Sequence, residues 1–185
     1  MDFGPEPQIC ALRRRGTLNA RGLAAYSTLT AIAIILSAAE SLAPVPVPAP
    51  GLKLGLANVV TLIILMNDSN PMNAFLVTIV RCVLSSLLLG ALSTVLFSLA
   101  GGLVSCAAMW VLLKRFGVLS PIGASVAGAV SHNITQLAVA SLIAGDAAIF
   151  GYLPPMLALG AATGTATGYV AVKSKRILNL MKKIT

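Results

Sequence analysis

The feature that most constrains this chain is a series of six apolar stretches that carry almost no charge. They cover about residues 22–43, 51–66, 72–90, 93–113, 121–144 and 152–172. About 20 apolar residues form an α-helix long enough to cross the hydrocarbon core of a bilayer. Of the 185 residues, 57% are hydrophobic and 10% are charged, against roughly 25% charged in soluble domains. This composition excludes a soluble globular enzyme and predicts an all-α integral membrane protein, a bundle of six transmembrane helices.

The second apolar stretch is shorter than the others. Four prolines between Pro44 and Pro50 forbid a helix there, so residues 44–53 are expected to form an extended loop. The apolar core from Leu54 to Met66 would rise only about 20 Å as a helix, less than the ~30 Å hydrocarbon core. In transporters, a short span beside a loop indicates a binding site. Lys53 would then either meet a ligand or anchor the helix at the membrane interface.

The basic residues predict how the chain sits in the membrane. Eleven of the thirteen Lys and Arg fall in the tail at 1–21, at 114–115 and in the tail at 173–185. These segments lie on one side if six helices cross the membrane. Positive charge accumulates on the cytoplasmic side, so both termini are expected inside, around a transmembrane domain at 22–172. The net charge of +8 therefore indicates contact with lipid headgroups, and no nucleic-acid partner is expected.

Two charged residues lie inside predicted helices. Arg81 is near the middle of the third stretch, and Glu40 is toward the outer end of the first. A charge at the bilayer centre costs roughly 2.5–3.5 kcal/mol, so such residues face a partner or a wet cavity. Two interpretations remain open: a structural ion pair, or side chains that line a ligand cavity.

Other polar residues gather in the fifth and second stretches. His132, Asn133 and Gln136 are three or four residues apart, which predicts that they share one side of a helix. Asn58 follows Lys53 at the start of the second stretch. Polar groups within a membrane must form hydrogen bonds, either with neighbouring helices or with a ligand. We expect no metal site, because the single histidine has no second strong ligand at helical spacing.

Small residues at a spacing of four indicate close helix contacts. Gly160, Gly164 and Gly168 form such a series in the sixth stretch. The first stretch contains the pairs Ala24/Thr28 and Ser27/Ala31. They indicate either packing within the bundle or docking of a partner protein.

Missing motifs also constrain the function. The chain has no GxxxxGK[ST] phosphate-binding loop and no GxSxG nucleophile motif. Its aspartates are Asp2, Asp68 and Asp146, too far apart in sequence to suggest a Mg²⁺ site for a diphosphate. Catalysis by this chain alone is therefore not expected, nor is a cofactor.

Several segments together resemble a known family. They are Glu40 with the prolines after it, the run GLKLGLAN at 51–58, Arg81, FSLAGG at 97–102, and GAVSHN at 128–133 with Gln136 and Leu137. They are similar to the Gx transporter family, often labelled heptaprenyl diphosphate synthase component I. That family is grouped with the substrate-binding S components of energy-coupling factor (ECF) vitamin transporters.

The resemblance implies a six-helix bundle in a bacterial cell membrane, with an outward-facing pocket covered by the loop between the first two helices. It also implies partners, namely a membrane T component and two cytosolic ATPases. Docking by S components often uses an AxxxA motif in the first helix. Here Ala24/Thr28 and Ser27/Ala31 approximate that motif.

These observations give one leading hypothesis and two alternatives. The first is a substrate-binding importer subunit for a small vitamin-like or precursor molecule. The residues expected to line its pocket are Glu40, Lys53, Asn58, Arg81, His132, Asn133 and Gln136. The second is a noncatalytic membrane subunit that assists prenyl diphosphate synthesis. The third is a stand-alone proton-coupled carrier that uses Glu40 and Arg81.

Overall fold

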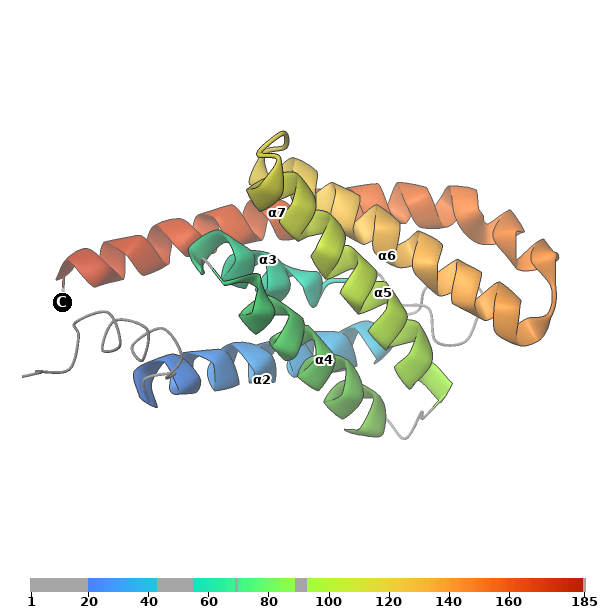
Figure 1. Ribbon diagram of the computed structural model, residues 1–185, viewed down its shortest axis with the longest axis horizontal. Coiled ribbons are helices and arrows are strands. Elements are labelled where there is room, and N and C mark those ends of the chain that lie inside the picture. Colours follow the sequence, from blue (N-terminus) through green and yellow to red (C-terminus); the bar gives the residue numbers. More distant parts are fainter. Residues whose placement is uncertain (1–19, 43–54, 69, 89–92, 185) are drawn as a thin grey trace, which may run out of the picture.

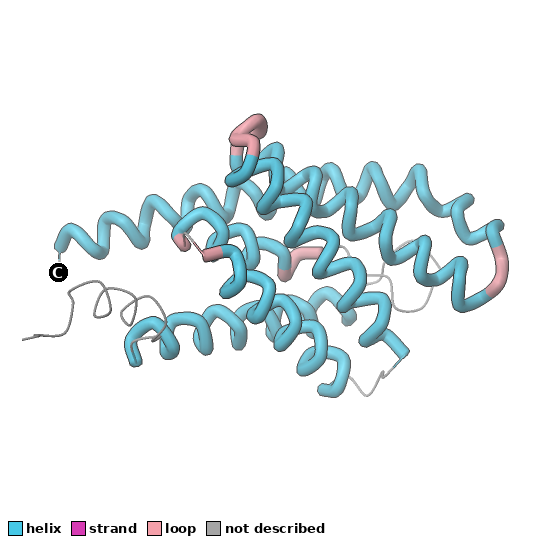
Figure 2. The backbone as a smooth tube through the Cα atoms, viewed as in Figure 1, coloured by secondary structure: helices cyan, strands magenta, loops and turns pink. Residues whose placement is uncertain are grey.

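The computed structural model describes residues 20–42, 55–68, 70–88 and 93–184. Within these ranges the secondary structure is entirely helical, and the loops between helices are short (Figures 1 and 2). The α-helices are α2 (Ala20–Leu42), α3 (Asn58–Asn67), α4 (Pro71–Leu88), α5 (Ser93–Trp110), α6 (Pro121–Ala144) and α7 (Leu153–Ile184). A π-helical turn, η1 (Val111–Arg115), ends α5, and a 3₁₀ segment, η2 (Ala147–Tyr152), precedes α7. The all-α class is confirmed.

Five of the helices are long and apolar enough to cross a membrane, by length and composition. These candidate spans are Gly22–Ser41, Pro71–Leu88, Thr94–Arg115, Pro121–Ala144 and Ala147–Lys175. The second predicted span corresponds to α3, which has 10 residues. At 1.5 Å per residue it rises about 15 Å, half of the ~30 Å hydrocarbon core. The proline-rich loop at 44–53 lies outside the described residues.

The short helix α3 occupies the centre of the bundle. It contacts each of the other five α-helices, and Figure 1 shows it between α2 and α4 on one side and α7 on the other. Every residue from Asn58 to Leu65 is buried. A helix buried on all sides must be apolar all around, as VVTLIILM is, so its few polar groups need partners inside the protein.

Helices α6 and α7 pack closely through glycines. A Cβ atom on Gly164 would lie 2.7 Å from Val126 Cα, and one on Gly168 would lie 2.8 Å from Ile122 Cα. The glycine face predicted for α7 therefore lies directly against the backbone of α6. The glycines therefore set how closely the two helices approach.

Helix α2 has the smallest buried share of the five candidate spans. It packs against α3 and α4, and 11% of its apolar window is buried, against 39% for α4. The apolar side chains on its outer surface, such as Ile35, are exposed as expected for a lipid-facing helix.

Candidate functional site

A chain of hydrogen bonds links three helices around Arg81. The Arg81 side chain is 4% exposed, and its Nη2 donates to Asn58 Oδ1 at 3.0 Å. The amide of Asn58 then donates through Nδ2 to Ser105 Oγ at 3.1 Å. Asn58 thus joins α4 to α5 from the first turn of α3. The guanidinium keeps one buried donor, Arg81 Nε, that has no hydrogen-bond partner among the described residues.

Glu40 lies near the end of α2. Its side chain is buried, and its Oε1 accepts a hydrogen bond from the backbone N–H of Gly55. Gly55 has a φ of +84°, in the left-handed region that favours glycine. A Cβ there would lie 3.0 Å from Asn58 Nδ2 and 3.7 Å from His132 Cδ2. The backbone before α3 therefore packs directly onto the polar cluster.

A small cavity brings the two charges together. It is lined by Ser37, Glu40, Gly55, Arg81, Cys82, Ser85, Ser98 and His132, which come from α2, α4, α5, α6 and the residue that leads into α3. Its interior has room for about one water molecule. Besides Arg81 Nε, the hydroxyl of Ser98 is buried without a hydrogen-bond partner among the described residues. A small cavity lined mainly by polar residues, inside an apolar bundle, is thus the candidate site.

The three polar residues predicted on α6 are all buried, but they do not share one environment. His132 lines the cavity and packs against Gly101, where a Cβ would lie 2.9 Å from His132 Nδ1. Gln136 packs against the same glycine, with its Cγ 3.1 Å from that Cβ position. Asn133 instead donates through Nδ2 to the backbone carbonyl of Met156 at 2.8 Å, which ties α6 to α7.

Two further residues were expected in the pocket, Asn58 and Lys53. Asn58 accepts a hydrogen bond from Arg81 and is not among the residues that line the cavity. Lys53 lies outside the described residues. The cavity adds serines that the sequence analysis did not select, Ser37, Ser85 and Ser98. Ser85 follows Arg81 by four residues and Ser37 precedes Glu40 by three, so helical spacing from the two charges could have identified both.

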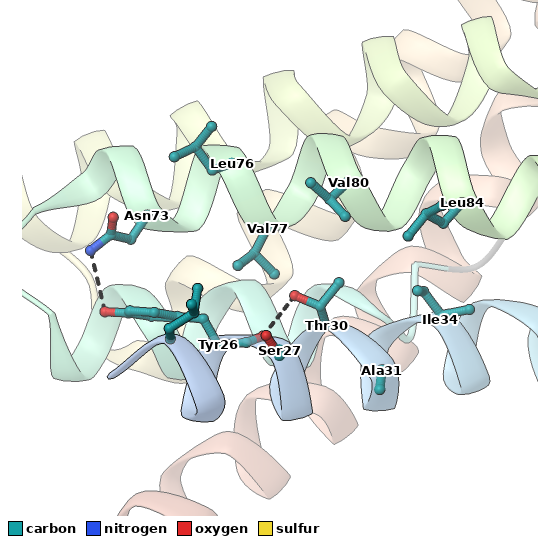
Figure 3. Close-up of a pocket in the computed structure, with 11 residues that line it drawn as sticks. Tyr26, Ser27, Thr30, Ala31, Ile34, Asn73, Leu76, Val77, Val80 and Leu84 are labelled. Carbon is teal, nitrogen blue, oxygen red and sulfur yellow. Dashed lines mark hydrogen bonds between the residues drawn. The ribbon is translucent and has the colours of Figure 1, made fainter. Parts of the chain in front are cut away.

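A second, larger hollow lies between α2 and α4 (Figure 3). It encloses about 510 Å³, within the range of small-molecule pockets, and is almost entirely apolar. The side chains that form its walls include Leu23, Ser27, Ala31, Ile34, Leu76 and Val80. We call this hollow the α2–α4 groove.

Two of the four residues predicted to dock a partner line this groove. Ser27 and Ala31 line it, whereas Ala24 and Thr28 are exposed elsewhere on α2. The Thr28 hydroxyl donates to the carbonyl of Ala24 at 2.9 Å, so the backbone of the same helix satisfies it. All four positions on α2 therefore carry small, exposed side chains.

Polar contacts close one end of the α2–α4 groove. Tyr26 OH donates to Asp68 Oδ2, and Asn73 Nδ2 donates to the same oxygen at 2.6 Å. Asn73 Nδ2 also donates to Tyr26 OH at 3.3 Å (Figure 3). Asp68 belongs to the turn between α3 and α4. This Tyr26–Asp68–Asn73 cluster fixes the first turns of α2 to the rest of the bundle.

No group of three or more His, Cys, Asp or Glu side chains that could hold a metal occurs among the described residues. Comparison with known protein families gives one match. The model of a family described as heptaprenyl diphosphate synthase component I matches residues 29–174. No curated protein and no solved structure matches the chain. The family match spans well over half of the chain and confirms the label that the sequence motifs indicated.

Proposed function

Because the chain belongs to the heptaprenyl diphosphate synthase component I family, we propose a role within a membrane complex. In this proposal the chain is the membrane-embedded substrate-binding subunit of an ECF-type importer for a small vitamin-like or precursor molecule. It binds the substrate, and partner ATPases supply the energy for transport.

The observation that carries this proposal is the polar cavity around Arg81. Burying an arginine, a glutamate and several hydroxyls inside an apolar bundle is unfavourable unless each finds a partner. Arg81 Nε and Ser98 Oγ have no hydrogen-bond partner among the described residues. A substrate that presents an oxygen to these two donors would supply the missing hydrogen bonds.

The proposed topology has six crossings in the bacterial cell membrane with both termini in the cytoplasm. In it α3 forms the cytoplasmic half of the second crossing, and its last residues and the Tyr26–Asp68–Asn73 cluster face the inside. The loop that carries Lys114 and Arg115, and the basic end of α7, lie on the same side. The cavity, formed by the end of α2 and the start of α3, then lies toward the outer leaflet.

The proposed partners are a membrane T component and two cytosolic ATPases. The small, exposed residues Ala24, Ser27, Thr28 and Ala31 on α2 give a surface on which another helix could pack closely. Since α2 is the least buried span, this surface is available without unfolding the bundle.

Affinity purification from native membranes in mild detergent, followed by mass spectrometry of the retained proteins, tests this proposal. We expect a transmembrane T component together with paired ATPases. Recovery of a prenyltransferase without any ATPase would instead support the synthase subunit described below. Recovery of the chain alone would favour a stand-alone carrier.

The Arg81→Ala variant tests the site directly once a ligand is in hand. We expect weaker ligand binding, while the variant still inserts into membranes and remains monodisperse. Lys173→Ala is the matched control, because Lys173 is exposed on α7 over the ring of Tyr169. Equal affinities of the two variants would remove Arg81 from the site.

A second candidate function is a noncatalytic membrane subunit of prenyl diphosphate synthesis. The family description names such a synthase, and the apolar α2–α4 groove is suited to a hydrocarbon chain. This function predicts stable association with a soluble, Asp-rich prenyltransferase. It also predicts that Ala31→Trp, which fills the groove, weakens binding of a prenyl diphosphate lipid.

A further inference from the structure

Two buried hydrogen-bond donors line the small cavity from neighbouring helices. Arg81 Nε on α4 and Ser98 Oγ on α5 have no hydrogen-bond partner among the described residues, so they do not bond each other. Each side chain is 4% exposed. Cys82 Sγ donates to the backbone carbonyl of Ser98 at 3.2 Å, which joins α4 and α5 at this level. Both donors therefore need an acceptor within the cavity that they share.

The same wall of the cavity also offers an acceptor. Ser85 lies one helical turn after Arg81, and its side chain is buried. The Ser85 hydroxyl donates to the carbonyl of Cys82 at 3.3 Å, which uses its hydrogen and leaves a lone pair on its oxygen. Helices α4 and α5 thus present two donors and one acceptor. This pattern does not depend on the walls that other segments form.

The size of the cavity limits what these groups can bind. Its interior has room for about one water molecule. Internal waters make about three hydrogen bonds, typically with buried polar groups that have no other partner. Leaving a buried donor without a partner is costly, and more so for a charged guanidinium than for a neutral group. One oxygen atom that accepts two hydrogen bonds and donates one fits both the size and the pattern.

We propose that this cavity binds one oxygen atom that carries a hydrogen. The oxygen accepts from Arg81 Nε and Ser98 Oγ and donates to Ser85 Oγ. In the free protein it belongs to a water molecule. A substrate of the importer that reaches Arg81 replaces this water with a hydroxyl group of its own. That replacement rests on the proposed function, whereas the oxygen site itself does not.

Two serine variants test whether the Ser98 hydroxyl has a partner oxygen. Ser86→Ala is the matched control, because Ser86 Oγ on α4 is also buried without a hydrogen-bond partner in the described part of the chain, but Ser86 does not line the cavity. Both substitutions give the same gain in helix propensity. Only Ser98→Ala removes a hydrogen bond to the proposed oxygen.

We expect purified, full-length Ser98→Ala to melt about 2–4 °C below Ser86→Ala, the shift that the loss of one hydrogen bond produces in a chain of this size. A dry cavity gives the opposite result, because removing a buried hydroxyl without a partner is neutral or stabilising. If Ser98→Ala melts at or above the temperature of Ser86→Ala, the oxygen site is wrong.

A shared oxygen also couples Arg81 to Ser98. Arg81→Lys keeps the positive charge and removes the Nε donor. In this background we expect Ser98→Ala to lower the melting temperature by less than it does in the wild type, whereas the effect of Ser86→Ala is the same in both backgrounds. An equal effect of Ser98→Ala in the two backgrounds would show that Arg81 and Ser98 do not share a partner, which contradicts the inference.

Native mass spectrometry of the detergent-purified wild type identifies the source of the oxygen. We expect the mass of the chain alone, which assigns the oxygen to water. A small molecule that is retained by the wild type and by Ser86→Ala but lost from Ser98→Ala would overturn the assignment to water and identify the source as a substrate hydroxyl.

The outcomes separate this inference from the proposed function. The melting experiments use the purified chain, so an affinity purification that recovers no ATPase would remove the substrate step and leave the oxygen site in place. Equal melting temperatures of Ser98→Ala and Ser86→Ala would remove the oxygen site, while recovery of the paired ATPases would still support an importer.

Discussion

Asn58 shows how one side chain can organise a buried polar site. It accepts from Arg81 and donates to Ser105, so its carbonyl and its amide are both used. An aliphatic residue at this position would leave the guanidinium with one fewer acceptor inside an apolar bundle. Asn58 is therefore a positioning residue for Arg81.

We expect Asn58→Ala to lower the free energy of unfolding by about 2–3 kcal/mol, because a charged donor and a buried hydroxyl each lose a partner. Unfolding in mixed micelles with increasing SDS measures this change. Asn67→Ala is the matched control on the same helix. Asn67 is exposed and, among the described residues, its side chain donates to the carbonyl of Ile63, so its loss should cost less than about 0.5 kcal/mol. Equal losses for the two variants would contradict this role.

The sequence was informative about single residues and less informative about their neighbours. Arg81, Glu40, Asn58 and His132 are conspicuous because they are polar inside apolar stretches, and the structure brings them to one region. The separate role of Asn133 could not be predicted, because its bond to Met156 depends on how α6 and α7 are rotated about their axes. Ser98 was not predicted as a cavity residue, because serines are common in membrane helices.

At the scale of elements, glycines decide where two helices touch. A Cβ on Gly164 would meet the backbone of α6, which cannot move aside as a flexible side chain could. The spacing of four residues between the glycines of α7 therefore predicted a close helix contact. It did not predict which helix would form that contact.

Gly164→Ala is expected to destabilise the protein by about 1–3 kcal/mol through overpacking against Val126. The same SDS titration measures the effect. Gly22→Ala provides the comparison, because nothing lies within 4 Å of the added Cβ and alanine favours a helix by about 1 kcal/mol. The prediction fails if Gly164→Ala is as stable as the wild type.

The first turns of α2 provide a prediction about motion. Tyr26→Phe removes the hydroxyl that bonds Asp68, so α2 should exchange its amide hydrogens faster while α6 is unchanged. Hydrogen exchange with mass spectrometry measures both helices in one sample. Tyr169→Phe on α7 is the control, since Tyr169 is exposed. Faster exchange throughout the molecule would indicate general destabilisation instead.

Helix boundaries followed the sequence where a capping signal was present. Pro121 follows Ser120, whose hydroxyl accepts from Gly123 N at 3.2 Å, and α6 ends at Ala144, before Gly145 with a φ of +66°. The start of α3 was less clear, since Leu54 to Ala57 are as apolar as the helix itself. The π-helical turn at the end of α5 has no signal in the apolar pattern.

For the whole molecule, the proposed topology makes a direct prediction. In a background without native cysteines, Val118→Cys lies in the exposed loop between η1 and α6, and Ala147→Cys lies in the exposed turn before α7. An impermeant thiol reagent should label Ala147→Cys in intact cells and Val118→Cys only after the membrane is opened. The opposite pattern would invert the topology.

The number of long helices and the distribution of basic residues were sufficient to predict the class of fold. They could not predict that the shortest helix would be central, because that position depends on packing between distant segments. In hindsight α3 has the sequence of a helix buried on all sides, apolar except for Thr61 between the asparagines at its two ends.

The opposite charges of Glu40 and Arg81 have a consequence for a cell with an energised membrane. Moving one elementary charge across a potential of 100 mV changes its energy by about 2.3 kcal/mol. Binding of a molecule without net charge involves no such electrical work, because the net charge of the cavity is the same before and after binding. Its affinity should therefore be the same in resting and depolarised cells, whereas the affinity of an ionic guest would follow the membrane voltage.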